Sequence, residues 1–234
     1  MERALGVTPP ETIAIDPERP LYEACRKMLA SRARRIPLIS NDSQTGRAMV
    51  TSVITQYRIL KFVAVNVGDT QNLRKPLKDI KLGSYGNLVK CSMDSIVLDV
   101  IHEMVKRSIS SVPIVTSEGE KEGKSLQQIH LTKTGLLLNV FEAVDVITLI
   151  KGGDYDSLQL SVGEALLKRS DDYPGIYTCS LDDGLDTIFE TIRKSRVHRL
   201  MVIDDHNCLK GILSLSDILQ YVLLEGESED MTIS

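Results

Sequence analysis

Two runs near the end of this chain decide its fold: His198-Arg-Leu-Met-Val-Ile-Asp204 and Gly211-Ile-Leu-Ser-Leu-Ser-Asp217. The first contains a continuous apolar stretch that ends in polar residues, which is the pattern of a buried strand entering a turn. The second begins as a return strand and ends in hydroxyl and carboxylate residues suited to a helix start. Together they predict a strand, a turn, a second strand and a helix.

The residues before these runs predict one more strand and helix. Apolar side chains recur at helical spacing at Leu185, Ile188, Phe189 and Ile192, after a β-rich stretch that begins at Ile176. The complete order is therefore strand, helix, strand, strand, helix. This mixed order predicts an α/β unit whose helices pack on a small sheet.

Weaker copies of the same pattern occur twice upstream. One contains Arg34-Arg-Ile-Pro-Leu-Ile39 and later Thr55-Gln-Tyr-Arg58. The other contains Ser110-Ser-Val-Pro-Ile-Val115 and later Glu142-Ala-Val-Asp145. Repetition of this kind indicates one supersecondary unit used several times, each copy needing a neighbour to cover its apolar face.

The spacing of the copies reveals an insertion. Arg58, Asp145 and Asp217 hold equivalent positions, 87 (145 − 58) and 72 (217 − 145) residues apart. Removing residues 120–134 restores a period of 72. Two origins of the insertion stay open, a genuine surface loop and translated intron sequence, and sequencing of cDNA across the region would separate them.

Composition excludes several classes of protein. A chain of 234 residues with 42% hydrophobic residues and a net charge of −4 can bury a core, but has no overall basic field for nucleic acid. We find no apolar run long enough to span a membrane and no secretion signal, which favours an intracellular location. The four cysteines lack Cys-x-x-Cys spacing and the histidines are scattered, so we expect reduced structural thiols and no metal site.

The helix start at residues 214–217 also suggests a ligand. Hydroxyls and free backbone N–H groups at a helix N-terminus favour a phosphate, and the Asp217 carboxylate could accept two ribose hydroxyls. Arg199 offers forked donors for phosphate oxygens. The alternatives are ordinary helix capping at Ser214 and a surface or satisfied core position for His198.

An enzyme is the least favoured reading of the sequence. The run Gly119-Glu-Lys-Glu-Gly-Lys-Ser125 superficially resembles a phosphate-binding loop, but its glycine spacing is one residue short and no suitable strand and helix flank it. No Ser/His/Asp or Cys/His set aligns with a strand end. We therefore predict a binding protein without catalytic activity.

Four motifs spread over the chain resemble a known family. They are Thr55-Gln-Tyr-Arg-Ile-Leu-Lys-Phe62, Leu160-Ser-Val-Gly-Glu-Ala-Leu166, Arg196-Val-His-Arg-Leu200 and Leu213-Ser-Leu-Ser-Asp-Ile-Leu219. The chain resembles the gamma subunits of AMP-activated protein kinase, in their fungal form, which are built from cystathionine-β-synthase-type (CBS) repeats. The resemblance implies a non-catalytic sensor of cellular energy state that binds AMP, ADP or ATP, assembles with a kinase alpha subunit and a scaffold beta subunit, and is cytoplasmic and nuclear. A purely structural subunit, whose nucleotide has no regulatory role, is the alternative.

The resemblance also implies a domain organisation of tandem CBS repeats in an α/β fold. It assigns a remnant of a linker helix to residues 1–11, repeat two to 12–65, a linker to 66–87, repeat three to 88–153, a linker to 154–175, repeat four to 176–226 and a flexible tail to 227–234. Because the family's first repeat is missing, repeats three and four are expected to pair and repeat two to stay unpaired. Its exposed helix faces, which would promote self-association, are expected at Leu21, Ala24, Cys25, Met28, Ile59, Leu60 and Val63.

Carried over by position, the family's nucleotide sites are unequal. The stronger predicted site consists of Ser84, Val89, Ile109, Ser110, Arg199, Ser214, Leu215, Ser216 and Asp217. The weaker one consists of Glu142, Asp145, Arg169, Ile176 and His198. Glu142 is expected to weaken that site, because its carboxylate would repel a phosphate or compete for the ribose. The third position holds Arg58, which cannot accept ribose hydroxyls, and Arg35, a remnant phosphate-facing residue, is expected to point at solvent.

Overall fold

The structure, a computed structural model, describes residues 13–42, 44–66, 72–116, 135–151, 153 and 155–230. The chain divides into two compact units. Unit 1 contains residues 1–74, 185–198 and 214–234, and unit 2 contains residues 75–184 and 199–213. Repeat four therefore contributes its helices to unit 1 and its strands to unit 2.

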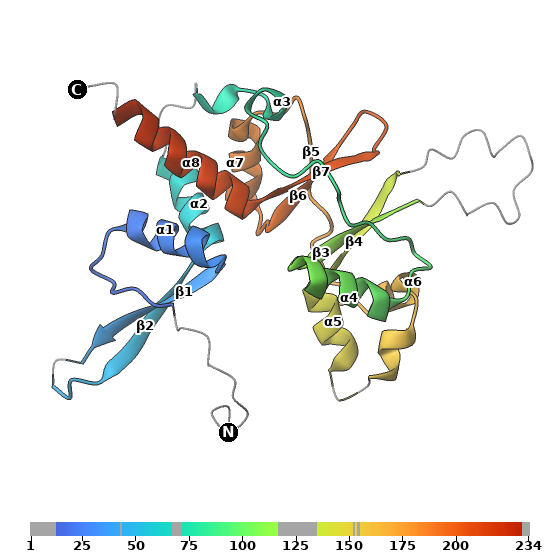
Figure 1. Ribbon diagram of the computed structural model, residues 1–234, viewed down its shortest axis with the longest axis horizontal. Helices are drawn as coiled ribbons and strands as arrows, with labels where there is room; N and C mark the ends of the chain where they lie inside the picture. Colours follow the sequence, from blue (N-terminus) through green and yellow to red (C-terminus); the bar gives the residue numbers. More distant parts are fainter. Residues whose placement is uncertain are drawn as a thin grey trace, which may run out of the picture. The chain divides into compact units, whose positions relative to one another are not determined.

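Unit 1 joins the helices and hairpin of repeat two to the two helices of repeat four (Figure 1). Its elements are α1 (Leu21–Ser31), β1 (Arg35–Asn41), β2 (Ala48–Thr55), α2 (Gln56–Asn66), η2 (Asn72–Arg74), α7 (Leu185–Lys194) and α8 (Leu215–Asp230). β1 and β2 pair antiparallel, with a bulge between Leu38 and Ile39. The predicted stripe of α7 is buried, since Leu185, Ile188 and Ile192 are each at most 1% exposed.

The expectation that the helices of repeat two lack a partner is wrong. α2 packs along α7 and contacts α8, and α1 also contacts α8. Arg193 of α7 donates a hydrogen bond to the carbonyl oxygen of Ala64 in α2. Most of the helix residues expected at the surface are buried, namely Ala24, Cys25, Met28, Ile59 and Leu60. The prediction failed because the apolar stripes of repeat two are covered by helices of repeat four, which sequence order does not indicate.

Unit 2 contains repeat three and the strands of repeat four (Figure 1). Its elements are α3 (Leu77–Ile80), α4 (Val97–Arg107), β3 (Ser111–Val115), β4 (Leu137–Glu142), α5 (Ala143–Ile150), η4 (Asp156–Gln159), α6 (Val162–Leu166), β5 (Thr178–Ser180), β6 (Arg199–Ile203) and β7 (Leu209–Ser214). β3 and β4 pair antiparallel, and β6 lies between β5 and β7. The predicted order of repeat four, from β5 to α8, is confirmed, as is the α/β class.

Repeats three and four meet in unit 2 through equivalent strands. The N–H of Leu137 donates to the carbonyl of Asn207, and the N–H of Leu209 donates to the carbonyl of Gly135, both at 3.0 Å. Leu137 and Leu209 are equivalent residues 72 positions apart, as are Gly135 and Asn207. The two hydrogen bonds are therefore related by a local two-fold axis, and the predicted contact between repeats three and four is present.

Gly211 in β7 lies against the chain that precedes repeat three. A Cβ atom at this position would lie 2.5 Å from Cδ1 of Tyr85 and 2.9 Å from the backbone oxygen of Ser84. Ser84 cannot easily move, because its N–H and C=O both bond to Ile212 at 2.9 Å. We expect Gly211→Ala to lower the free energy of unfolding by about 1–3 kcal/mol in urea titration. Gly86→Ala, where nothing lies within 4 Å of the added Cβ, is the control, and an equal loss in both variants would contradict this packing.

Several sequence predictions concern the ends of the elements. The remnant at residues 1–11 and the insertion at 120–134 lie outside the described residues. α8 continues to Asp230, into the segment predicted as a tail.

Among the described residues, no helix has the length and apolar character to cross a bilayer. The cysteines are free thiols, as predicted, and burial raises the pKa of Cys91 and of Cys179 to about 12.

Candidate functional site

Asp217 lies in the first turn of α8, in unit 1, and is hydrogen-bonded to Ser214. Oδ2 of Asp217 accepts from the backbone N–H of Ser214 at 2.8 Å and from its hydroxyl at 2.7 Å. The N–H of Asp217 donates to Oγ of Ser214 at 3.3 Å. This reciprocal arrangement is a helix cap, and it leaves Oδ1 of Asp217 as the oxygen not engaged by Ser214.

Ser216 contacts a residue that sequence reasoning missed. Its hydroxyl lies 3.2 Å from Oε1 of Gln56, the first residue of α2. Gln56 is only 4% exposed, and its Nε2 donates to the carbonyl of Ala33 at 3.5 Å. A buried amide requires such partners, so a glutamine at the start of an apolar helix was the available signal. The third predicted residue here, Leu215, is buried at 4% exposure.

Arg199, the first residue of β6 in unit 2, contacts two other predicted residues. Its guanidinium donates to the hydroxyl of Ser110 at 3.1 Å and lies 3.5 Å from the carboxylate of Glu142. The side chains of Arg199 and Glu142 are 11% and 21% exposed. The arginine predicted to face a phosphate is therefore held by a carboxylate of its own chain.

The other members of the stronger predicted site in unit 2 are fixed through their backbones or by packing. The bonds from Ser84 to Ile212 attach it to β7. The N–H of Ile109 donates to the carbonyl of Met104 at 2.9 Å, just after α4. Val89 and Ile109 are half-buried against the core of repeat three. Ser214, Leu215, Ser216 and Asp217 belong to unit 1, so the nine residues of this site are divided between the units and the site as a whole stays a prediction.

Asp145 is the residue of repeat three equivalent to Asp217. Its carboxylate forms a buried ion pair with Arg169 within unit 2. Nε of Arg169 donates to Oδ1 of Asp145 at 2.6 Å, and the NH2 group donates to Oδ2 at 2.5 Å. Oδ2 also accepts from the backbone N–H of Glu142 at 2.7 Å. The Asp145 residue is 3% exposed, so ribose hydroxyls would have to displace Arg169 to reach it.

Further contacts hold Arg169 on Asp145. Its guanidinium donates to Asn139 at 3.0 Å and to the carbonyl of Val140, and its carbon Cζ lies 4.0 Å from the centre of the Tyr173 ring. Burial lowers the pKa of Arg169, but the hydrogen bonds and charge of Asp145 outweigh it and leave the pKa above its usual value. Burial, followed by the charge of Glu142, raises the pKa of Tyr173.

The ion pair between Asp145 and Arg169 is a second reason to expect weak nucleotide binding around Asp145, besides the charge of Glu142. Glu142 forms a capping box with Asp145 at the start of α5, in addition to its contact with Arg199. Ile176 packs against the cluster of Val140, Met201 and Leu209, also in unit 2. His198, the remaining predicted member, belongs to unit 1.

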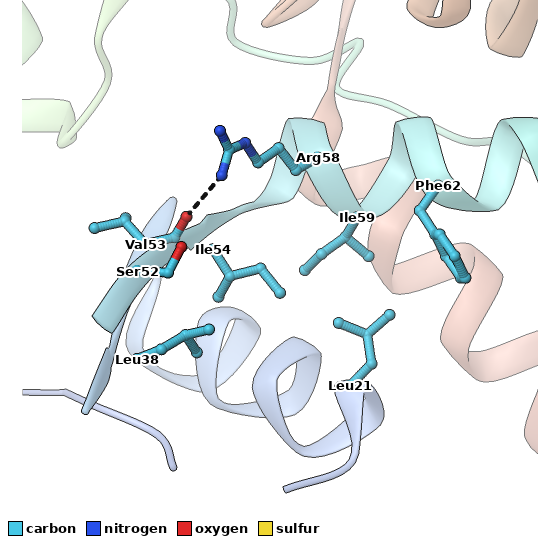
Figure 2. A pocket seen from close by; sticks show the side chains of 8 residues that line it. All are labelled: Leu21, Leu38, Ser52, Val53, Ile54, Arg58, Ile59 and Phe62. Atoms are coloured by element: carbon cyan, nitrogen blue, oxygen red, sulfur yellow. Dashed lines mark hydrogen bonds between the residues drawn. The ribbon is translucent and has the colours of Figure 1, made fainter. Parts of the chain in front are cut away.

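The position equivalent to these aspartates in repeat two holds Arg58, which borders an apolar pocket. Arg58 donates to the carbonyl of Val53 at 3.4 Å (Figure 2). The pocket has a volume of about 290 Å³ and is lined by Leu21, Leu38, Ser52, Val53, Ile54, Arg58, Ile59 and Phe62. None of these eight lining residues is a carboxylate, and whether this position binds a nucleotide stays a prediction. Arg35 is exposed at the start of β1, as predicted.

Comparison with known proteins agrees with this repeat architecture. A CBS-domain model matches residues 172–224. Gamma subunits of 5'-AMP-activated protein kinase from Kluyveromyces lactis and Saccharomyces cerevisiae are each 50% identical to the chain over 224 residues, or 95% and 96% of it. The chain has the tandem CBS fold, and nearly its whole length is similar to these gamma subunits. It spans 63% and 65% of the length of those two relatives.

The CBS fold is also found in a solved structure from an archaeon. A protein of Methanocaldococcus jannaschii, described as an archaeal homologue of g-AMPK, matches with a TM-score of 0.67 at 17% identity. The match covers 91% of this chain and 67% of that protein. The tandem CBS fold predicted from the repeats is confirmed.

In the described parts of the chain, no group of three His, Cys, Asp or Glu side chains is placed to hold a metal ion. The structure brings the predicted polar site residues together in two sets. They are Ser214 with Asp217 in unit 1, and Ser110, Arg199, Glu142, Asp145 and Arg169 in unit 2. These sets combine hydroxyls, carboxylates and guanidinium groups, which are the groups that bind ribose and phosphate.

Proposed function

We propose that this chain is a non-catalytic regulatory subunit of an AMP-activated-type Ser/Thr protein kinase that binds AMP, ADP or ATP and reports the energy state of the cell. It assembles with a kinase alpha subunit and a scaffold beta subunit, in the cytoplasm and nucleus. The 50% identity to two gamma subunits over nearly the whole chain supports this assignment. Nucleotides would act by binding one conformation of the kinase more tightly than another.

The geometry at the start of α8 is the observation that best supports nucleotide binding. Ser214 orients the carboxylate of Asp217 through two short hydrogen bonds, at 2.8 and 2.7 Å, and this carboxylate is the proposed acceptor for ribose hydroxyls. The Asp145 carboxylate of repeat three is instead satisfied by Arg169. We therefore expect about one tightly bound nucleotide per chain.

A structural subunit without a regulatory role is the second candidate. The internal pairing of Asp145 with Arg169 favours it, because a closed site holds the fold together without a ligand. Assembling the chain with alpha and beta subunits and titrating AMP, ADP and ATP separates the two candidates. A change in kinase activity or in dephosphorylation rate supports the sensor, and a stable trimer that no nucleotide affects supports the structural subunit.

We expect Asp217→Ala to weaken AMP binding by about 1–3 kcal/mol, the scale for removing a charged hydrogen-bonding partner. Isothermal titration calorimetry of the full chain measures this loss together with the stoichiometry. Asp183→Ala is a matched control, because Oδ2 of Asp183 accepts from the N–H of Ser180, three residues earlier, at 2.7 Å, as Oδ2 of Asp217 does from Ser214.

The control separates ligand binding from the loss of this side-chain to backbone hydrogen bond. If only Asp217→Ala weakens AMP binding, Asp217 contacts the nucleotide. A folded Asp217→Ala protein with unchanged affinity, or an equal effect of both substitutions, would remove Asp217 from the site. Two equally tight sites per chain would contradict the closed state of Asp145.

A further inference from the structure

Glu142 carries a charge at a position where the other two repeats have a hydroxyl. Its equivalents are Thr55, 87 residues earlier (142 − 55), and Ser214, 72 residues later (214 − 142). Their hydroxyl oxygens accept from the backbone N–H of Arg58 at 3.2 Å and of Asp217 at 3.3 Å. The side chain of Glu142 does the same at the start of α5. A neutral hydroxyl is sufficient for this cap, so capping alone does not account for a charged residue.

The charge of Glu142 lies against Arg199. Glu142 ends β4 of repeat three and Arg199 begins β6 of repeat four, and both belong to unit 2. NH1 of Arg199 lies 3.5 Å from Oε1 of Glu142, while its NH2 group donates to the hydroxyl of Ser110 at 3.1 Å. The side chains of Arg199 and Glu142 are 11% and 21% exposed, so water and salt screen their attraction less than at the surface.

The neighbouring carboxylate, Asp145, is balanced by a different arginine. It accepts two hydrogen bonds from Arg169, in a pair that is 4% and 10% exposed. The four charged side chains therefore carry two positive and two negative charges, and their net charge is zero (2 − 2 = 0). Without the charge of Glu142, the net charge of the set would be +1 (2 − 1 = 1). A positive set of side chains attracts a phosphate more strongly than a neutral one.

A phosphate that binds Arg199 has to compete with Glu142. Arginine binds carboxylate and phosphate oxygens through the same N–H donors, and two anions close together repel each other. The helix cap keeps the Glu142 carboxylate beside Arg199, so this carboxylate is present at a high effective concentration. A competitor of this kind lowers the affinity for any ligand that places a phosphate on the arginine.

We propose that Glu142 is an internal competitor for the nucleotide phosphate at Arg199, and that it thereby sets the affinity of the stronger nucleotide site. This role rests on the proposed function, in which Arg199 is expected to contact the phosphate. It is distinct from the expected weakening of the site around Asp145, because it acts on the site around Asp217. Since the competition concerns the phosphate, it should distinguish AMP from adenosine, which has the same base and ribose but no phosphate.

Isothermal titration calorimetry of the full chain with AMP and with adenosine measures the competition. Glu142→Gln removes the charge but keeps an amide oxygen that can accept the capping hydrogen bond. We expect it to tighten AMP binding at the stronger site by about 10-fold, the scale of one partly buried charge contact, and to leave the adenosine affinity unchanged. Glu142→Ser, which copies the hydroxyl of Ser214, should show the same gain.

Glu164→Gln is the matched control. Glu164 is exposed and also belongs to a capping box, in which its carboxylate accepts from the N–H of Ser161 at 2.9 Å at the start of α6. Because Glu164 belongs to neither predicted nucleotide site, this substitution should leave the AMP affinity unchanged.

The titrations have several outcomes that contradict a competitor role. AMP affinity that is unchanged or lower in folded Glu142→Gln and Glu142→Ser proteins would overturn it. So would an equal gain for AMP and adenosine, because competition for a phosphate cannot act on adenosine. A second bound AMP, with the affinity of the first unchanged, would confine the effect of Glu142 to the site around Asp145 and likewise refute the competitor role. Absence of AMP binding by the unaltered chain and both variants would overturn the proposed function itself, and the competitor role with it.

Discussion

Replacing Asp145 by alanine is expected to lower the free energy of unfolding by about 3–5 kcal/mol, the scale for breaking a buried ion pair by removing one partner. The side chains of Arg169 and Asp145 are 10% and 4% exposed, and three hydrogen bonds end on the carboxylate. Without it, the guanidinium of Arg169 stays buried without its counter-charge, and the start of α5 loses a capping partner.

Urea unfolding of the full chain, followed by circular dichroism, measures the loss. The exposed pair Glu190 and Lys194, 60% and 73% exposed, is the control, because an exposed pair one helical turn apart contributes only about 0.3–0.5 kcal/mol. Combining Asp145→Ala with Arg169→Met should recover part of the stability, since no buried charge is left uncompensated.

The outcome also bears on the ligand. A loss as small as that of Glu190→Ala would mean that Asp145 is not committed to Arg169. Its carboxylate would then be available to a second nucleotide. A large loss, with recovery in the double variant, would identify Arg169 as the internal occupant of this site.

The repeat pattern was sufficient to predict the fold class. Each copy carries a strand pair and an amphipathic helix at a fixed spacing, and these local signals do not depend on which neighbour covers them. The order from β5 to α8 and the burial of Leu185, Ile188 and Ile192 follow from such signals. The contact between repeats three and four was expected from the family resemblance and not from the repeat pattern itself.

The partners of side chains were less accessible to sequence reasoning. An apolar stripe shows that a helix is covered, but not by which element, so the packing of α2 on α7 was missed. Sequence reasoning also missed the partner of Asp145. A carboxylate at this position suggests a ribose acceptor, but in the structure it is hydrogen-bonded to Arg169, 24 positions later. Gln56 was overlooked, although a glutamine at the start of an apolar helix can indicate a buried amide.

Substituting Leu60 tests whether the helices of repeat two are covered. Leu60 in α2 is 0% exposed, and α2 packs against α7 and α8 within unit 1. Removing a buried leucine side chain leaves a cavity, so we expect Leu60→Ala to lower the free energy of unfolding by about 2–5 kcal/mol. Val65→Ala in the same helix, at a residue that is 61% exposed, should change it by less than about 0.5 kcal/mol.

Hydrogen exchange of the two proteins shows where the lost stability resides. Because α7 and α8 cover α2, Leu60→Ala should reduce amide protection in residues 185–194 as well as in residues 56–66. If the helices of repeat two were not covered, Leu60→Ala would lower the free energy of unfolding no more than Val65→Ala. The amides of α7 would then keep their protection. Loss of protection in α2 alone would mean that the helices of repeats two and four do not stabilise each other. Loss in both places makes unit 1, although assembled from three separate stretches of chain, one cooperative unit.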